Sequence, residues 1–335
     1  MEVVPRFGAG KRSISTMSGK KTQRRAQGSG SSGAAKKMPA KGRPTSEPPR
    51  ISGRWLFWAV SGTVATAALC AWGVLCLLFW QGSWQLLYSP SAQIMRTPAS
   101  AGLAFEPVAF AVTEEGTPRI RGWWIPAEPN AQFGRYSVLF LHGKAGNMGD
   151  TLDALSRLHQ VGVNILAFDY RGYGQSQFVR PSEASLRQDA DWALSYLSAT
   201  RHIDSGTIVL DGEGLGANLA LEVGAAHPEL AGVIVESPIS SPMNAIFNDA
   251  RAKLVPARLL VRDRYDMLTA SARMRIPVLW FERVAQDGSN RLNGEPAAYR
   301  EVANHKTLVW LNPQINEARD FSDAAARWLD GLPSR

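Results

Sequence analysis

Hydrophobic and polar residues divide the chain into three stretches of different character. Residues 1–53 are rich in Lys, Arg, Ser, Gly and Pro and poor in large apolar side chains. Such a stretch buries too little apolar surface to offset the entropy of ordering, so we expect a disordered basic tail. Residues 55–80 follow as 26 residues without a charge. From residue 85 to residue 335, short apolar runs alternate with helical patterns, which is typical of a folded α/β domain.

The uncharged run predicts one transmembrane helix over residues 54–82. At about 1.5 Å per residue, residues 55–80 reach about 39 Å, which exceeds a hydrocarbon core of about 30 Å and allows a tilted span. A helix of this length that is apolar all round is unlike a helix buried in a soluble domain. Its partner is therefore expected to be the lipid bilayer. Aromatic residues near the two ends resemble interfacial belts, and they are Trp55, Trp58, Trp80, Trp84 and Tyr88.

The surroundings of this run predict its orientation. It begins after more than 50 residues, which favours an uncleaved signal anchor over a cleaved signal peptide. Basic residues on the N-terminal flank, through Arg50 and Arg54, place that flank in the cytoplasm by the positive-inside rule. The domain then lies outside the cytoplasm, in the periplasm of a Gram-negative cell. Both cysteines, Cys70 and Cys76, fall inside the run, which leaves the domain without a disulfide or a thiol nucleophile.

The net charge of +8 belongs to the N-terminal tail. Residues 1–54 hold 13 of the 37 Lys and Arg but 2 of the 29 Asp and Glu, so the remainder is slightly acidic. The tail has no interleaved aromatic residues and no zinc ligands, and we therefore expect no nucleic-acid partner. Metal motifs such as H-E-x-x-H or C-x-x-C are also missing, and we expect neither a metal nor another cofactor. Oligomeric state is not readable from the pattern.

The apolar runs of the third stretch predict a mostly parallel sheet with helices on both faces. An opening antiparallel pair is expected at 107–113 and 119–125, and the core strands at 137–141, 163–168, 207–211, 232–236, 277–281 and 307–311. The clearest helical patterns are 181–198 and 217–227. Ligands of such sheets bind beyond the carboxyl ends of the strands, so the turns that follow the strands are the candidate site.

Three glycine-containing turns follow these strands. The sequence LHGKAGN comes after 137–141, and its residues His142, Gly143 and Lys144 allow backbone amides to point into a site, as an oxyanion hole requires. DYRGYGQS follows 163–168. After 207–211 comes Gly212-Glu213-Gly214-Leu215-Gly216, which has the form of the G-x-S-x-G elbow with glycine in place of serine.

These turns, together with PSEASLRQDADWALSYL, VIVESPISS and LLVRDRYDMLTASARMRIPVL, resemble the membrane-anchored α/β-hydrolases of the serine-aminopeptidase-like type, which are related to depalmitoylating hydrolases. The similarity runs from about residue 87 to residue 332. It implies an α/β-hydrolase fold with a small helical cap over 240–275. It also implies a catalytic triad after the fifth, seventh and eighth core strands, and an oxyanion hole made by the turn at His142 and by Leu215.

The residues at the three triad positions do not suit that chemistry. Gly214 has no side chain to act as a nucleophile, and the alignment puts Gln286 on the acid and Asn316 on the base. Asp287 would take the acid position after a one-residue shift of the loop, and the alternative interpretation, which we favour, is a solvated loop aspartate. No histidine follows His305, which precedes the last strand.

Two functions stay open. The first is a membrane-tethered pseudoenzyme whose pocket binds a small acyl, lipid or peptide ligand, or which acts as a scaffold. The second is an active hydrolase of esters, thioesters or peptides that uses a displaced nucleophile, for which the available serines are Ser176, Ser237, Ser240 and Ser241.

Overall fold

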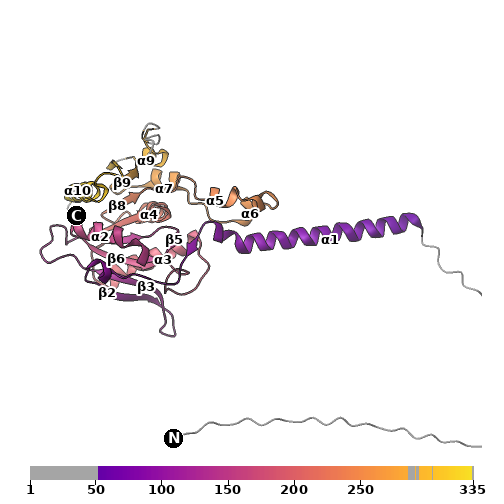
Figure 1. The fold of residues 1–335 in the computed structure, drawn as a ribbon, viewed down its shortest axis with the longest axis horizontal. Coiled ribbons are helices and arrows are strands. Elements are labelled where there is room, and N and C mark those ends of the chain that lie inside the picture. The colour runs from indigo at the N-terminus through magenta and orange to yellow at the C-terminus, as the bar shows by residue number, and fades with distance from the viewer. Residues whose placement is uncertain (1–51, 286–290, 292–293, 304, 334–335) are drawn as a thin grey trace, which may run out of the picture. The chain divides into compact units, whose positions relative to one another are not determined.

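The computed structural model describes residues 52–285, 291, 294–303 and 305–333, and within them the chain forms an eight-stranded sheet flanked by helices (Figure 1). The strands are β2 (Glu106–Val112), β3 (Pro118–Ile125), β4 (Ser137–Leu141), β6 (Asn164–Asp169), β7 (Ile208–Glu213), β8 (Gly232–Glu236), β9 (Val278–Arg283) and β10 (Lys306–Leu311). Their spatial order is β10-β9-β8-β7-β4-β6-β3-β2. Each predicted run forms a strand whose ends differ from the prediction by at most two residues.

Strand β3 is antiparallel to both of its neighbours, and the other neighbouring pairs are parallel. The central strands β4 and β8 are buried at every position. Helices cover both faces there, which is why these strands read in the sequence as continuous apolar runs instead of alternating patterns. This order and these directions confirm the predicted α/β-hydrolase fold.

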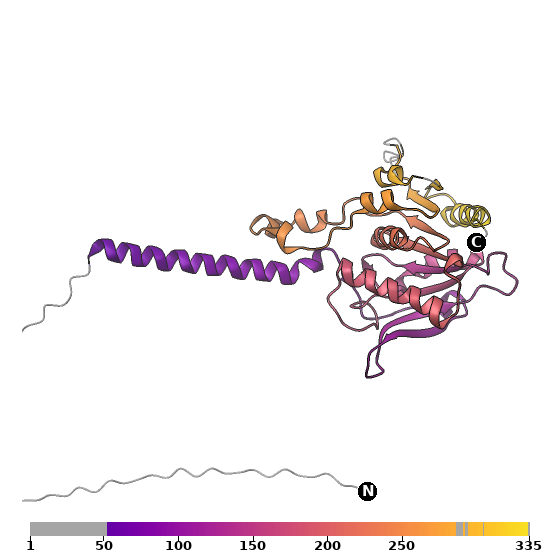
Figure 2. The same ribbon diagram turned by 180° about the vertical axis from the view of Figure 1, so that it is seen from behind.

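Helices form a layer on each face of the sheet (Figure 2). On one face α2 (Leu152–Val161) packs against α10 (Glu317–Asp330). On the other, α4 (Leu215–Ala226) packs against β7, β8 and its neighbours α3 (Glu183–Ser195) and α7 (Met267–Arg273), and the short α9 (Ala297–Glu301) lies against α7. The predicted helix 181–198 is divided, since α3 passes into a π-helical turn over Tyr196–Thr200.

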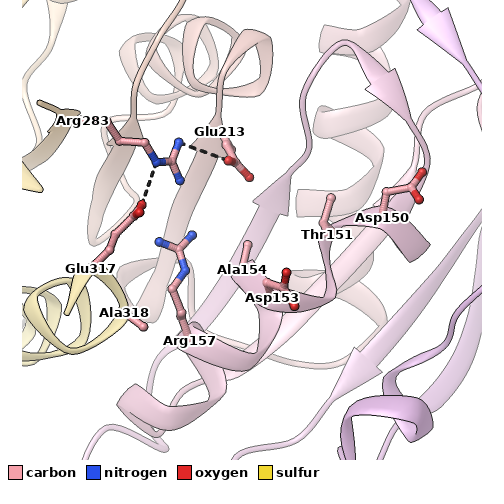
Figure 3. A pocket seen from close by; sticks show the side chains of 9 residues that line it. All are labelled: Asp150, Thr151, Asp153, Ala154, Arg157, Glu213, Arg283, Glu317 and Ala318. Atoms are coloured by element: carbon pink, nitrogen blue, oxygen red, sulfur yellow. Dashed lines mark hydrogen bonds and ion pairs between the residues drawn. The ribbon is translucent and has the colours of Figure 1, made fainter. Parts of the chain in front are cut away.

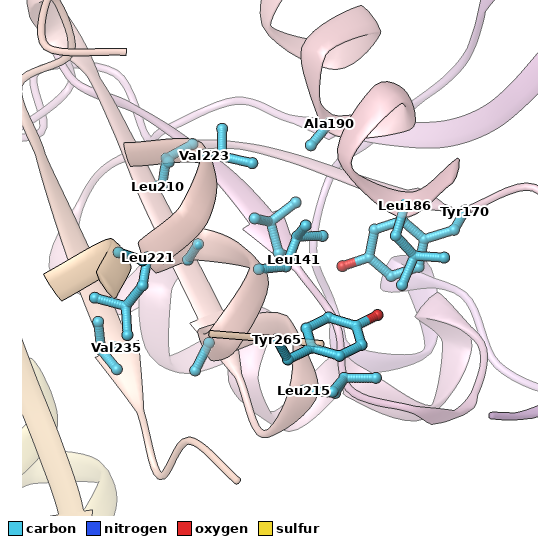
Figure 4. Packing of buried hydrophobic residues seen from close by; sticks show 14 of the residues in the cluster. Leu141, Tyr170, Leu186, Ala190, Leu210, Leu215, Leu221, Val223, Val235 and Tyr265 are labelled. Atoms are coloured by element: carbon cyan, nitrogen blue, oxygen red, sulfur yellow. The ribbon is translucent and has the colours of Figure 1, made fainter. Parts of the chain in front are cut away.

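The connection from β8 to α7 forms a small helical cap. It contains α5 (Asn244–Phe247), a 3-10 turn over Ala250–Lys253, and α6 (Ala257–Leu260). Tyr265 of this connection is buried in the same apolar cluster as Leu215, the first residue of α4, and Figure 4 shows both in that cluster. The cap is therefore packed on the sheet layer that carries the elbow.

Helix α1 (Gly53–Gly82) is long and apolar enough to cross a membrane, by length and composition. Most of its side chains are exposed, including Trp58 (70%) and Leu69 (66%). It meets the domain along its C-terminal part. Trp72 donates to the carbonyl of Leu254 in the cap, and Phe79 is buried in the core, with Leu75 and Cys76 packed against that core. Over most of its length α1 is thus not covered by the protein.

The chain turns back onto the domain directly after α1. A 3-10 turn over Ser83–Leu86 leads to the two-residue strand β1 (Ser89–Pro90), which pairs in parallel with β5 (Ala145–Gly146). Because of this turn Tyr88 is 1% exposed and Trp84 packs on the core. The expectation that Tyr88 belongs to an interfacial belt is therefore wrong.

Candidate functional site

The turn from β7 into α4 has the backbone of a nucleophile elbow. Gly214 at its apex has φ 59° and ψ −116°, which side-chain-bearing residues rarely adopt, and its amide donates to the carbonyl of Glu236 at 2.9 Å. A Cβ at Gly214 would meet no heavy atom within 4 Å. A Cβ at Gly212 or Gly216, in contrast, would collide with backbone. The apex is open, and the flanking glycines are required by close backbone approach.

The predicted oxyanion turn lies beside this elbow. A Cβ on Gly143 would be 3.5 Å from the carbonyl oxygen of Glu213. Leu215 begins α4, so its amide is one of the first-turn N–H groups that lack an acceptor within the helix. The carbonyl of Lys144 accepts from the Tyr173 hydroxyl at 2.8 Å. The structure therefore places the turn after β4 beside the turn that leads into α4, and the role of these two turns as an oxyanion hole stays a prediction.

His142 lies in the same turn, with its ring in the protein interior. The ring is 4.4 Å from that of Tyr170, Nδ1 is 2.9 Å from the carbonyl of Gly143, and Nε2 is 3.6 Å from Asp169 Oδ1. Burial lowers the pKa of His142 to about 4 and raises the pKa of Asp169 to about 7. His142 is therefore neutral near pH 7, buried, and held among aromatic rings as a packing residue.

An ion-pair cluster occupies the carboxyl edge of the sheet next to the elbow (Figure 3). Arg283, the last residue of β9, donates from Nε to Glu317 Oε1 at 2.7 Å, and its Nη1 lies 3.4 Å from Glu213 Oε1. Glu213 directly precedes Gly214, and Glu317 directly follows Asn316. Charged side chains therefore connect the three segments in which the resemblance implies a nucleophile, an acid and a base.

A second arginine, Arg157, is connected to this cluster through Glu236, with which Arg283 also pairs. Arg157 of α2 lies 4.4 Å over the Phe321 ring and donates to Glu236 Oε2 at 3.0 Å. Asp211 of β7 is fully buried, and burial together with the charge of Glu236 raises its pKa. A pocket of about 360 Å³ opens beside the two arginines, lined by Asp150, Thr151, Asp153, Ala154, Arg157, Glu213, Arg283, Glu317 and Ala318. In the described part of the chain, no three His, Cys, Asp or Glu side chains are grouped to hold a metal ion.

The remaining predicted triad positions are placed only in part. Gln286 and Asp287 lie outside the described residues. Asn316 has φ 51°, in the left-handed region that asparagine tolerates, and immediately precedes α10. The carbonyl of His305 accepts from the amide of Val278 at 2.9 Å, so this histidine lies at the amino ends of β9 and β10, away from the elbow.

Sequence reasoning missed Arg157, Arg283 and Glu317. An arginine at the end of a buried apolar strand is itself a signal, because a cation there needs an anionic partner nearby. No sequence signal identifies which carboxylates those partners are. They come from β7 and α10, far from Arg283 in the chain.

The serines near the strand ends differ in what surrounds them. Ser176 is fully engaged, since its hydroxyl donates to the carbonyl of Asp169 at 2.6 Å and accepts from the amide of Arg121 at 2.9 Å. Ser240 and Ser241 are exposed. They line a pocket of about 480 Å³ under the cap, together with Pro242, Met243, Asn244, Phe247, Arg258, Arg264, Tyr265, Asp266, Met267 and Leu268.

Comparison with known proteins supports the same fold. A family model described as "serine aminopeptidase, S33" matches residues 134–313. The uncharacterized protein Rv2307c of Mycobacterium tuberculosis is 33% identical over 271 residues, which cover 79% of this chain and 93% of that protein. The alpha/beta hydrolase domain-containing protein 17B of Xenopus tropicalis is 33% identical over 134 residues, 40% of this chain and 45% of that protein.

Solved structures extend the comparison to the fold alone. The esterase Pf2001 of Pyrococcus furiosus superposes with a TM-score of 0.55 at 16% identity, over 74% of this chain and 99% of the esterase. An α-β hydrolase of Vibrio vulnificus gives a TM-score of 0.51 at 20% identity, over 70% of this chain and 83% of that protein.

Proposed function

Since the chain belongs to the serine aminopeptidase S33 family and carries glycine at the apex of its elbow, we propose that it is a membrane-anchored hydrolase-fold protein without serine-hydrolase chemistry. In this proposal the domain binds a small acyl, lipid or peptide ligand, or serves as a scaffold. One observation carries it: Gly214 keeps the elbow backbone and an open apex, but it offers no atom that attacks a carbonyl.

The histidines give a second argument. A serine nucleophile needs a histidine within hydrogen-bond reach to take its proton. His142 is buried with its pKa lowered to about 4, and His305 lies at the amino ends of the strands. His159 contacts the carbonyl of Pro126, and His227 bonds Asp191 and Glu229. His202 is exposed in the loop before β7. These placements support a Gly214 position that has no histidine base, even if a serine stood there.

The charge cluster gives a third argument. Arg283 at the end of β9 pairs with Glu213 of β7 and with Glu317 of α10. The three residues come from the segments in which a catalytic triad would lie. These side chains neutralise one another's charge without a substrate. Their ion pairs occupy the edge of the sheet at which a hydrolase needs a histidine that is free to exchange protons. We infer that this cluster maintains the shape of the elbow after the loss of its chemistry.

The cap pocket is the proposed binding site. Its lining combines the apolar side chains of Met243, Phe247 and Met267 with the polar groups of Ser240 and Arg264. Polar or charged side chains and apolar side chains both line this pocket, and such a mixture is suited to an amphipathic small molecule. It fits an apolar chain with a polar head better than it fits a highly charged ligand.

Helix α1 is the proposed anchor. It is exposed over most of its length, and a soluble protein that left so many large apolar side chains in water would aggregate. The basic flank ending at Arg54 favours a cytoplasmic N terminus and an extracytoplasmic domain. Labelling of a Val112→Cys variant, in a background without Cys70 and Cys76, by a membrane-impermeant maleimide added to intact cells tests this orientation. Labelling only after lysis would contradict it.

Fluorophosphonate labelling tests the loss of serine chemistry. The full chain in detergent is treated with the probe, adducts are mapped by mass spectrometry, and the esterase Pf2001 serves as the positive control. We expect no adduct on the wild type and none on Gly214→Ser, because a serine at 214 still lacks a base. A stoichiometric adduct on one wild-type serine would overturn the proposal.

The alternative is an active hydrolase, and the exposure of Ser240 and Ser241 in the cap pocket is the observation in its favour. Turnover of short acyl esters by the wild type that disappears in Ser240→Ala or Ser241→Ala would establish it. Equal rates in both variants and in a buffer blank would exclude these serines as nucleophiles.

Ligand binding needs its own test. A fluorescent fatty acid is titrated into the full chain in detergent, with Ser241→Trp to fill the cap pocket and Val112→Trp as a matched change on the exposed edge strand β2. We expect saturable binding that Ser241→Trp abolishes and Val112→Trp preserves. Equal binding by both variants would place the ligand elsewhere.

A further inference from the structure

The cap carries a segment in which basic and apolar side chains are exposed together. Residues 250–262 read ARAKLVPARLLVR and contain four basic residues and no acidic one, whereas the chain after residue 54 is slightly acidic overall. Leu254 is 61% exposed and Leu259 is 79% exposed. Arg251, Lys253, Arg258 and Arg262 are exposed beside them. Exposed leucines among cations are typical of segments that lie in a membrane interface.

This segment touches the anchor helix. The indole Nε1 of Trp72 donates to the carbonyl of Leu254 at 3.1 Å, although the two residues are 182 positions apart. Figure 1 shows α5 and α6 extending from the domain toward the side on which α1 lies. The cap segment and α1 therefore lie side by side at Trp72, and both carry exposed apolar side chains.

The position of this contact along α1 limits where a bilayer can lie. Trp72 is ten residues before the end of α1 at Gly82, about 15 Å along the helix axis. If the hydrocarbon covered the helix up to Trp80, the cap around Leu254 would be submerged with Lys253 and Arg251. Charged side chains inside hydrocarbon are costly, so this arrangement is disfavoured.

A different placement satisfies both elements. Residues 53–72 form 20 residues of helix, about 30 Å, which equals the thickness of the hydrocarbon core. Trp72 then lies at the boundary, where tryptophan is enriched, with Trp55 and Trp58 at the opposite boundary. The last ten residues of α1 stand in the interface beside the cap.

We propose that the cap segment 250–262 is a second membrane contact, which lies in the interface of the leaflet at the C-terminal end of α1, with Leu254 and Leu259 toward the acyl chains and the basic residues at anionic headgroups. This inference rests on the anchoring part of the proposed function and is independent of ligand binding. It also places the cap pocket at the membrane interface, because that pocket shares Phe247 and Arg258 with a second hollow that is lined by Leu259 of the cap segment.

Depth-dependent fluorescence quenching tests the inference. Single cysteines are introduced at Leu259, at Val112 and at Val64 in the full chain with Cys70→Ala and Cys76→Ala, labelled with an environment-sensitive dye, and reconstituted in vesicles of phosphatidylcholine with phosphatidylglycerol. All three positions are more than half exposed, so the dye does not disturb the core. Lipids with a nitroxide near the headgroup or deep in the acyl chain act as quenchers.

We expect the dye at 259 to be quenched by the shallow nitroxide, the dye at 64 by the deep one, and the dye at 112 by neither. Lys253→Gln with Arg262→Gln should reduce the quenching at 259 and leave that at 64 unchanged, because the cap loses headgroup attraction while the anchor stays. Quenching at 64 with none at 259 would overturn the inference but keep the anchor. No quenching at 64 would remove the anchor itself.

Discussion

The hydroxyl oxygens of Tyr88 and Tyr265 lie 2.7 Å apart, in a buried contact between the segment that leaves α1 and the segment that closes the cap. Tyr88 also donates to Asp263 Oδ2 at 2.7 Å. Two residues later, Pro90 of β1 pairs with Gly146 of β5 in the turn beside the elbow. The segment that follows α1 is thus attached both to the cap and to the turn after β4.

Tyr88→Phe should destabilise the domain by about 1–3 kcal/mol, because it removes a hydrogen-bond partner from the buried hydroxyl of Tyr265 and from the partly buried carboxyl of Asp263. Urea unfolding in detergent, followed by circular dichroism, measures the loss. The double variant Tyr88→Phe with Tyr265→Phe should lose less than the sum of the single losses. Strictly additive losses would show that the two hydroxyls do not interact.

Gly214→Ser should fold with an unchanged sheet, because the Cβ meets open space, and should lose about 1–3 kcal/mol through its left-handed backbone. Gly216→Ser is the matched control, since its Cβ would collide with the carbonyl of Leu141. We expect that control to unfold or to express poorly. Soluble yield and thermal unfolding distinguish them, and equal behaviour of the two variants would contradict the elbow geometry.

Arg283→Gln should lower the free energy of unfolding by about 1–3 kcal/mol. This is less than the loss for a fully buried ion pair, because the Arg283 side chain is 34% exposed. Its removal leaves Glu213, Glu317 and Glu236 close together without their shared cation. Arg319→Gln, from the exposed pair with Asp323 on α10, is the control and should change the free energy of unfolding by less than about 0.5 kcal/mol. A loss no larger than the control would mean that the cluster contributes nothing to the site.

Asp169 should make stability depend on pH. Its folded pKa of about 7 exceeds its ordinary value of 3.8 because of burial, so between these values the folded state holds a proton that the unfolded state has released. Stability from this group is present at low pH and is lost as pH rises through about 7, by at most about 1.4 kcal/mol per pH unit. Asp169→Asn should remove this decline.

The lowered pKa of His142 has the opposite effect, since stability rises as the pH increases from about 4 through the ordinary value of 6.5. Wild type and Asp169→Asn both contain His142, and the difference between them therefore reports the loss of the Asp169 carboxyl together with its effect on the neighbouring His142 ring. Urea unfolding from about pH 5 to about pH 8 measures that difference. Parallel curves for wild type and variant would show that the Asp169 carboxyl is ionised throughout.

Local pattern was sufficient for much of the fold. The buried run 137–141 and the run 232–236 coincide with β4 and β8, since a strand covered on both faces needs a continuous apolar segment with no partner specified. The glycines at 212 and 216 likewise predicted the elbow, because close backbone approach on either side of Gly214 leaves no room for a Cβ.

The candidate site was less predictable because its charges pair across the sheet. Arg283 reaches Glu213 of β7 and Glu317 of α10, and these distances depend on the order of the strands. The sequence pattern alone assigned Arg283 no role. Tyr88 was likewise assigned to an interface, because the turn over Ser83–Leu86 that buries it carries no strong sequence signal.

The sequence by itself determined the strand and helix types, the long apolar helix and the absence of a nucleophile at Gly214, because these depend on a residue's own chemistry and its near neighbours. Only the tertiary structure decided that Arg283 joins two carboxylates, that Tyr88 meets Tyr265, and that Trp72 meets Leu254. Those contacts join residues far apart in the chain, and only the packed sheet, cap and helix bring their polar atoms within bonding distance.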